Sequence, residues 1–264
     1  MENISLPQTI SAKNIAENHD EITISPCYPG YGTTLGNALR RVLLSSLPGG
    51  ATTATKIKGV DHEFSTLENV KEDVVDIILN LKQLRFKVHS EEPIELTLKV
   101  KGEKDVTAAD FDKNSQIEVV TPKAHIATLT SKNAEFEMTL MVQNGRGYVP
   151  VEMREKEKLE LGYIAIDAVY TPVKTVNFNT EHVRVEEMTN YDKLILDITT
   201  DGTLSPIEAL RQASDILVQQ FNHIKDNVEE ESAEKEEEEE EKETKKEESK
   251  EKEDKEEDKK EDKK

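Results

Sequence analysis

A break in composition near residue 228 divides this 264-residue chain into two parts that differ in their capacity to fold. From residue 229 to residue 264 nearly every side chain is Glu, Asp or Lys, with 21 acidic and 11 basic residues. Such a segment cannot bury enough apolar surface to offset its conformational entropy, although its Glu/Lys pairs at helical spacing also fit a fluctuating, solvated helix. We therefore expect a disordered charged tail over residues 229–264 and a folded body before it.

The body is acidic and long enough to contain one large domain or two modest domains, of which two is the preferred interpretation. It carries half of the formal charge of −20, and a chain of that length can bury a sizeable core. An acidic surface repels the phosphate backbone, so contact with DNA is expected only through other proteins.

The sequence lacks the marks of several protein classes. No stretch approaches the roughly 20 apolar residues of a membrane span, and the N-terminal MENISLPQTI lacks the profile of a signal peptide. Cys27 is the sole cysteine, so it cannot form an internal disulfide, and no Cys/His cluster has the spacing of a zinc site. These features predict a cytoplasmic protein without a membrane segment, a metal ion or a cofactor.

Periodicity predicts long helices near both ends of the body. Residues 21–25 alternate as a half-buried strand, and Thr33 or Thr34 then caps a helix that runs through Leu47 and stops at Pro-Gly-Gly. The last helix begins at Ser205-Pro206, with proline in its first turn, and continues to about residue 228.

Many short strands and one helix are expected between these ends. The helix is introduced by the capping-box pattern Ser65-Thr66-Leu67-Glu68 and keeps an apolar stripe as far as Leu81. The expected strands are residues 54–57, 85–88, 94–100, 117–119, 124–129, 136–142, 163–169, 173–178, 184–187 and 194–199. This order predicts an α+β fold in which residues 1–48 and 172–228 form one discontinuous domain and residues 49–171 a strand-rich domain inserted in it.

The first helix has two faces of different character. Its core face is formed by aliphatic residues at helical spacing, among them Leu35, Leu39 and Leu43. On the other side Leu44 is framed by Arg40 and Arg41. Arginine is favoured in the centres of interfaces, so this face suits a protein partner, although a solvated face with one stray leucine is the alternative.

The last helix carries more apolar surface than one fold requires. Its apolar residues, which include Leu210, Leu217 and Phe221, spread over about half of the circumference, wider than the usual stripe of about 100°. A symmetric homodimer explains this surface most simply, and a helix enclosed in a larger domain is the alternative.

The search for catalytic motifs yields only weak candidates. The strand, turn and helix around residues 30–36 (GYGTTLG) resemble a dinucleotide-binding turn, but the third glycine is one place late. The alternative is that these glycines permit a tight strand-to-helix turn. Residues 145–148 (GRGY) are a weak phosphate motif, and a sharp turn after a strand ending at Val142 is the simpler interpretation. No catalytic residue is predicted.

Several sequence blocks together resemble one known family. Residues 34–46 (TLGNALRRVLLSS) are similar to the signature helix of the bacterial RNA polymerase alpha subunit. The further blocks, in family order, are GVDHEFST at 59–66, LNLK at 79–82, VTAAD at 106–110, GRGYVP at 145–150 and DKL at 192–194. Each block alone is weakly specific, but together they span nearly the whole body.

The resemblance implies a non-catalytic, homodimeric scaffold of a DNA-directed RNA polymerase. By resemblance, both ends of the body form the dimerisation domain, with the leucines 35, 39, 43, 210 and 217 and Phe221 at its interface. One copy would bind the beta subunit and the other beta-prime, and DNA would be reached only through the assembled enzyme.

Site residues are also implied by the resemblance. Those similar to beta-contact positions are Arg40, Arg41, Leu44, His62, Glu63, Phe64, Ser65 and Thr66. Those similar to positions that hold the large subunits, beta-prime among them, are Lys82, Ile166 and Asp167, with Ile166 where valine is expected. The family usually continues into a DNA-binding carboxy-terminal domain, whereas here only the charged tail follows. The competing interpretation is a stand-alone dimeric adaptor whose acidic tail binds basic partners.

Overall fold

The computed structural model describes residues 4–154 and 159–228, so the predicted disorder of residues 229–264 lies outside the described residues. The chain separates into two compact units at Ser214 and Asp215. The first unit contains both sheets described below and the first turns of the last helix. The second unit contributes the remaining described turns of that helix, which spans residues 206–228.

A four-stranded antiparallel sheet combines the two ends of the body. Its strands, in spatial order, are β1 (Thr9–Ala16), β2 (His19–Cys27), β14 (Met188–Thr200) and β13 (Val173–Val185). The register places Ile24 opposite Leu194 and Ile22 opposite Leu196, and all four side chains are buried on one face. Apolar alternation on β2 and β14 thus brings together strands that are distant in sequence.

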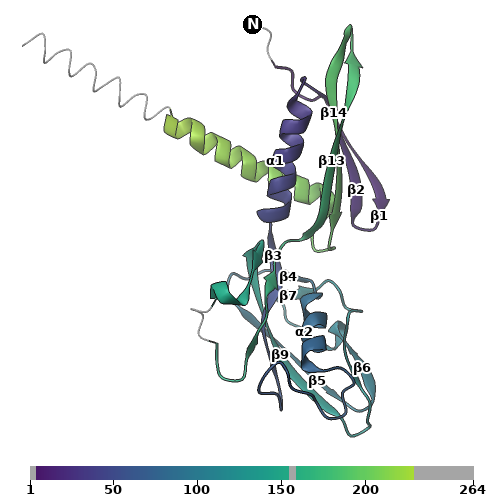
Figure 1. Cartoon of the computed structure of the whole chain (residues 1–264), viewed down its shortest axis with the longest axis vertical. Coiled ribbons are helices and arrows are strands. Elements are labelled where there is room, and N and C mark those ends of the chain that lie inside the picture. Colours follow the sequence, from purple (N-terminus) through teal and green to yellow (C-terminus); the bar gives the residue numbers. More distant parts are fainter. Residues whose placement is uncertain (1–3, 155–158, 229–264) are drawn as a thin grey trace, which may run out of the picture. The chain divides into compact units, whose positions relative to one another are not determined.

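Helix α1 (Tyr31–Ser45) lies beside β13 and β14 (Figure 1). It begins earlier than the predicted Thr33 or Thr34, because Gly30 adopts the left-handed conformation (φ 83°) that permits a sharp entry into the helix. It also ends before Leu47, and the following Pro-Gly-Gly sequence starts a strand.

The middle of the chain forms a strand-rich domain around a six-stranded sheet. Its strands are β5 (Ile94–Lys101), β9 (Glu135–Arg146), β3 (Pro48–Ile57), β4 (Phe86–Val88) and β7 (Ile117–Val119) in spatial order, with β11 (Ile164–Ala165) also paired to β3. The smaller elements are β6 (Lys104–Thr107), β8 (His125–Leu129), β10 (Tyr148–Val149), β12 (Ala168–Val169), η1 (Ala108–Asp110) and η2 (Val151–Arg154). Strand β6 pairs with β8, and β10 pairs with β12.

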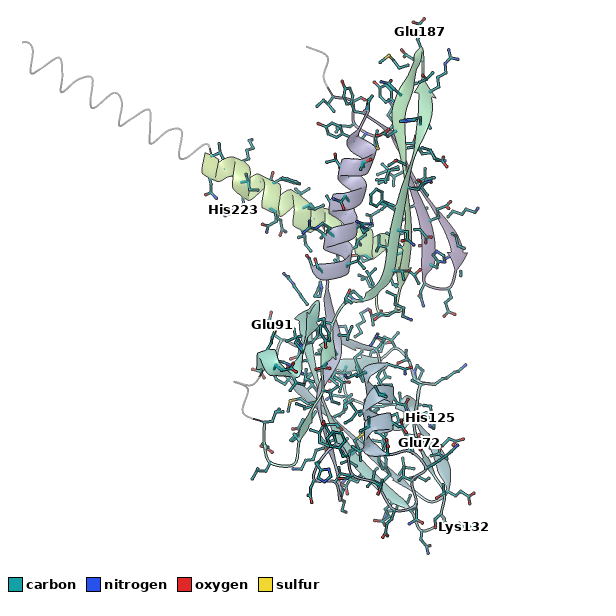
Figure 2. The ribbon with its side chains drawn as sticks, in the orientation of Figure 1. Glu72, Glu91, His125, Lys132, Glu187 and His223 are labelled. Atoms are coloured by element: carbon teal, nitrogen blue, oxygen red, sulfur yellow. The ribbon has the colours of Figure 1, made fainter. Side chains whose placement is uncertain are left out.

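Helix α2 (Val74–Lys82) packs into the core of this domain through Val74, Ile77 and Leu81. The prediction that this helix starts at Ser65 is wrong. Its cap is Asp73, whose carboxylate accepts the N–H of Asp76 at 2.8 Å. Residues 65–73 instead form a loop that distant contacts hold, since Glu72 accepts the N–H of Thr128 at 2.7 Å and faces His125 across 3.0 Å (Figure 2).

Several strand predictions also need correction. Strand β1 is not predicted, because all eight of its residues are exposed and no apolar alternation marks it. A separate strand over 184–187 does not form, because β13 continues to Val185 and the chain turns at Glu186, where φ is 54°. Strand β9 runs past Val142 to Arg146, so the predicted turn falls at Gly147, where φ is 67°.

The glycines after α1 have a packing role in strand β3. A Cβ atom on Gly49 would lie 2.0 Å from the carbonyl oxygen of Tyr170, and one on Gly50 would lie 2.7 Å from that of Phe86. Only glycine allows backbones to approach this closely. The glycines of the Pro-Gly-Gly sequence therefore serve the packing of β3, whereas α1 already ends at Ser45, before this sequence.

Candidate functional site

The amino end of α1 is held by a buried carboxylate from strand β14. Oδ2 of Asp192 accepts the backbone N–H groups of Gly30 at 2.9 Å and Gly32 at 3.1 Å. These amides have no partner within the helix, and the positive end of the helix dipole favours a negative charge there. A Cβ atom on Gly32 would lie 2.8 Å from the Cβ of Asp192. The glycines therefore serve close packing of α1 on the sheet, which favours the tight-turn interpretation over a dinucleotide site.

The outer face of α1 exposes the two arginines and the leucine that the sequence singles out. Arg40 is partly fixed, since its Nη2 donates to Asn37 at 3.2 Å and its guanidinium lies 5.2 Å from the ring centroid of Phe178. Arg41 is exposed and has no hydrogen-bond or ion-pair partner for its side chain among the described residues. Leu44, one turn away, is 40% exposed. This face offers unpaired charge and apolar surface together.

The predicted dimer-interface leucines of α1 fall into two groups. Leu39 and Leu43 are buried within the chain, against its own sheet, while Leu35 is half-buried. On the helix over residues 206–228, Leu210 and Leu217 are half-buried and Phe221 is exposed. Further exposed apolar residues of this helix are Ile207, Val218, Ile224 and Val228.

Residues 62–66 form an ordered loop before α2. The N–H of Ser65 donates to the carbonyl oxygen of His62 at 3.1 Å, and the two side chains approach within 3.2 Å. The carbonyl oxygen of Ser65 in turn accepts the N–H of Val74 at 3.3 Å, which fixes the loop on the first turn of α2. Glu63, Phe64 and Thr66 are exposed, and Phe64 retains 77% of its accessible surface.

Lys82 and Asp167, both among the residues implied to hold the large subunits, form an ion pair. Nζ of Lys82 lies 2.9 Å from Oδ2 of Asp167, and Oδ1 of Asp167 accepts the N–H of Val151 at 3.1 Å. These two interactions lower the pKa of Asp167. Ile166 is buried, and its N–H donates to the carbonyl oxygen of Thr53 at 2.9 Å. It therefore packs beneath the ion pair and is not part of the exposed surface.

Arg154 and Met153 were not expected at this site. Arg154 donates to the carbonyl oxygens of Ile166 and Thr53, so η2 is tied down at both ends, by Arg154 and by the N–H of Val151. Met153 on this turn is largely exposed. No periodic pattern marks a single turn of helix, so the sequence offers no signal for it.

Two general searches complete the description of the site. Within residues 4–154 and 159–228, no three His, Cys, Asp or Glu side chains are grouped so that they could hold a metal ion. In that same part of the chain, no helix combines the length and the apolar character required to cross a membrane.

Comparison with known proteins places the chain in a family. Residues 55–171 match the family described as RNA polymerase Rpb3/RpoA insert domain. The DNA-directed RNA polymerase subunit alpha of Roseiflexus sp. (strain RS-1) is 46% identical over 226 residues, which are 86% of this chain and 69% of that protein. The subunit of the same name from Roseiflexus castenholzii is 44% identical over 239 residues, covering 88% of this chain and 73% of that protein. The chain therefore belongs to the family of bacterial DNA-directed RNA polymerase alpha subunits.

Proposed function

We propose that this chain is the homodimeric assembly platform of a DNA-directed RNA polymerase, which binds the beta and beta-prime subunits and contributes no catalytic residue. The observation that carries the proposal is the outer face of α1, where Arg41 and Leu44 are exposed opposite a buried face. Exposed arginine beside apolar surface is typical of interface centres. Membership of the alpha subunit family supports the same conclusion.

In this proposal residues 1–48 and 172–228 form the dimerisation domain, and residues 49–171 form the inserted domain. The sheet that joins both ends of the body supports the first assignment, and the family match over residues 55–171 supports the second. A second copy of the chain covers the exposed apolar residues of the last helix, Phe221 among them, because a monomer rarely leaves such a surface in water. Leu35, Leu210 and Leu217 border that surface, while Leu39 and Leu43 stabilise it from within the core.

The two large subunits use different surfaces of the two copies. One copy engages beta through Arg41 and the loop over residues 62–66, with Phe64 as an aromatic anchor. The other copy engages beta-prime around the Lys82–Asp167 pair. Binding of beta to one copy removes the twofold symmetry, so identical chains acquire different roles.

The test measures the size of the full chain alone and after mixing with the beta subunit of the same polymerase, by chromatography with light scattering. The native protein should be a dimer that captures beta. Arg41→Ala should weaken capture at least about tenfold and leave the dimer intact, as expected for an interface anchor. Among the described residues, the exposed Arg184 on β13 bonds only within its own hairpin, so Arg184→Ala should change neither property.

The opposite result would favour another function. A monomer, or a dimer that does not bind beta, would contradict the proposal and support the stand-alone adaptor.

A further inference from the structure

A nearly buried salt bridge joins the strand-rich domain to the end of the four-stranded sheet. Nε of Arg85, directly before β4, lies 3.2 Å from Oδ2 of Asp201, directly after β14, and their side chains are 19% and 3% exposed. An exposed ion pair contributes little to stability, whereas loss of one partner from a buried pair leaves an uncompensated charge. The Arg85–Asp201 pair therefore constrains both elements.

Arg85 also binds the carboxyl end of α2. Its Nη1 donates to the carbonyl oxygens of Lys82 at 2.9 Å and Leu84 at 3.0 Å. The last carbonyl groups of a helix lack partners within the helix, and an arginine can satisfy them. The guanidinium thus fixes the backbone of Lys82, the residue whose side chain pairs with Asp167.

Asp201 binds the segment that leads into the last helix. Its Oδ1 accepts the N–H of Thr203 at 2.9 Å and the hydroxyl of the same residue at 2.6 Å. Its own N–H donates to the carbonyl oxygen of Pro172 at 2.9 Å. The helix begins at residue 206, three positions beyond Thr203, and Ser205 caps it by accepting the N–H of Glu208. The carboxylate thereby fixes the start of this helix, over residues 206–214.

Close packing leaves the turn after β14 little freedom. Gly202 has a φ of 96°, and a Cβ atom there would lie 3.1 Å from Nδ2 of Asn18 and 3.4 Å from Cγ1 of Val120. The N–H of Val120 donates to the carbonyl oxygen of Arg85 at 2.9 Å. The turn is thus enclosed between the β1–β2 connection and the strand-rich domain. It can move only if one of these neighbours moves with it.

We propose that Arg85 and Asp201 are positioning residues that hold the end of α2, with Lys82, in one orientation relative to the first turns of the last helix. Since those turns lead into the proposed dimer surface, the pair couples dimerisation to capture of beta-prime, a consequence that rests on the proposed function. Without the Arg85–Asp201 salt bridge, the end of α2 and the first turns of the last helix sample several relative orientations. The apparent affinity for beta-prime then falls in proportion to the population of the binding-competent one.

The test measures a distance within the full chain. Spin labels are attached at Lys132→Cys and Glu187→Cys, two exposed sites labelled in Figure 2, after replacement of the buried Cys27 by alanine. Labelled chains are diluted with unlabelled chains, so that each dimer carries one pair of labels. With the Arg85–Asp201 salt bridge intact, the two spin labels should give a single narrow distance. Asp201→Asn keeps the side-chain shape but turns an amide NH₂ group towards either Arg85 or Thr203, and it should abolish the single narrow distance.

Two further variants separate positioning from general stability. Arg85→Lys keeps the positive charge but has all its donors on one nitrogen. It cannot reach the carbonyl oxygens of Lys82 and Leu84 and also Asp201, so it should broaden the distances too. Glu181→Gln breaks the exposed pair with Lys193 inside one hairpin and should leave the distance narrow. Circular dichroism verifies folding, and Thr203→Val replaces any variant that does not fold. An unchanged narrow distance in the folded variants overturns the proposal.

Capture of beta-prime by the complex of this chain with beta is measured on the same variants. Broadened distances together with about tenfold weaker capture support the coupling, because that loss corresponds to a binding-competent fraction of about one tenth. Broadened distances with undiminished capture overturn the coupling. If the native protein captures neither subunit although the variants broaden the distance, the proposed function is overturned and the positioning role is supported.

Discussion

The ammonium group of Lys82, in the last turn of α2, lies 2.9 Å from Oδ2 of Asp167, just before β12. The second carboxylate oxygen accepts the N–H of Val151. Both interactions favour the charged carboxylate, so the pKa of Asp167 is lowered. The carboxylate of Asp167 thus connects the end of α2 with the η2 turn, and this connection depends on its charge.

Asp167→Asn is expected to destabilise the fold by about 1 kcal/mol near neutral pH, since the pair is partly screened by water. Because the folded-state pKa is lowered, this contribution is complete above the ordinary aspartate pKa of about 4 and is lost as pH falls through the lower folded value. Urea unfolding over a pH series should show the stability gap to the native protein narrowing at acidic pH. Glu118→Gln, at an exposed position on β7, is the control and should give no such gap. If the difference in unfolding free energy between Asp167→Asn and the native protein does not change with pH, the charged carboxylate of Asp167 is not what stabilises the fold.

Asp192→Ala should destabilise the protein by about 1–3 kcal/mol, because the N–H group of Gly30 and the buried N–H group of Gly32 lose their acceptor. The loss is local, so amide hydrogen exchange should accelerate most in the first turn of α1. Lys193→Ala alters the neighbouring residue without touching these amides. It serves as the control, and equal acceleration in both variants would refute a capping role for Asp192.

Gly36→Ala should cost about 1–3 kcal/mol through overpacking. A Cβ atom at this position would lie 2.5 Å from Cδ2 of Phe178 and 2.9 Å from Cδ1 of Leu194. Thermal and urea unfolding provide the measurement. Thr33→Ala, an exposed position on the same helix, should stay within about 0.5 kcal/mol of the native protein. Native stability of Gly36→Ala would mean that α1 can move away from the sheet at little cost.

Phe64→Ala should separate binding from folding. Since the ring is 77% exposed, its removal should alter the free energy of unfolding by no more than about 0.5 kcal/mol, yet weaken capture of beta at least about tenfold. Phe86→Ala makes the contrasting change in the core and should cost about 3–5 kcal/mol. If Phe64→Ala captures beta as well as the native protein does, the loop over residues 62–66 is not an anchor.

Features decided within one element are predicted well from the sequence. Strand β5 follows the predicted alternation, and the last helix begins at residue 206, where Ser-Pro predicts it. Features decided by distant partners are not predicted. The edge strand β1 relies on backbone pairing with β2, and the start of α2 is set by contacts of Glu72 with β8.

The same division applies to the candidate site. Helical periodicity is enough to place Arg41 and Leu44 on one exposed face of α1. It cannot show that Asp192 caps that helix, since the carboxylate and Gly30 are 162 positions apart in the chain. The Arg85–Asp201 pair is hidden for the same reason: neither residue belongs to a local motif, and only the assembled sheets bring them together.

The pairing of β2 with β14 has a consequence for synthesis on the ribosome. Strand β2 and helix α1 emerge early, but β14, against which both pack, emerges only after the whole strand-rich domain has been made. Domains generally fold as units in the order of synthesis, so the middle of this chain should fold while the apolar residues of its first strands still lack their partner. During that interval the apolar face of β2 stays uncovered, so the four-stranded sheet can form only after β14 has left the ribosome.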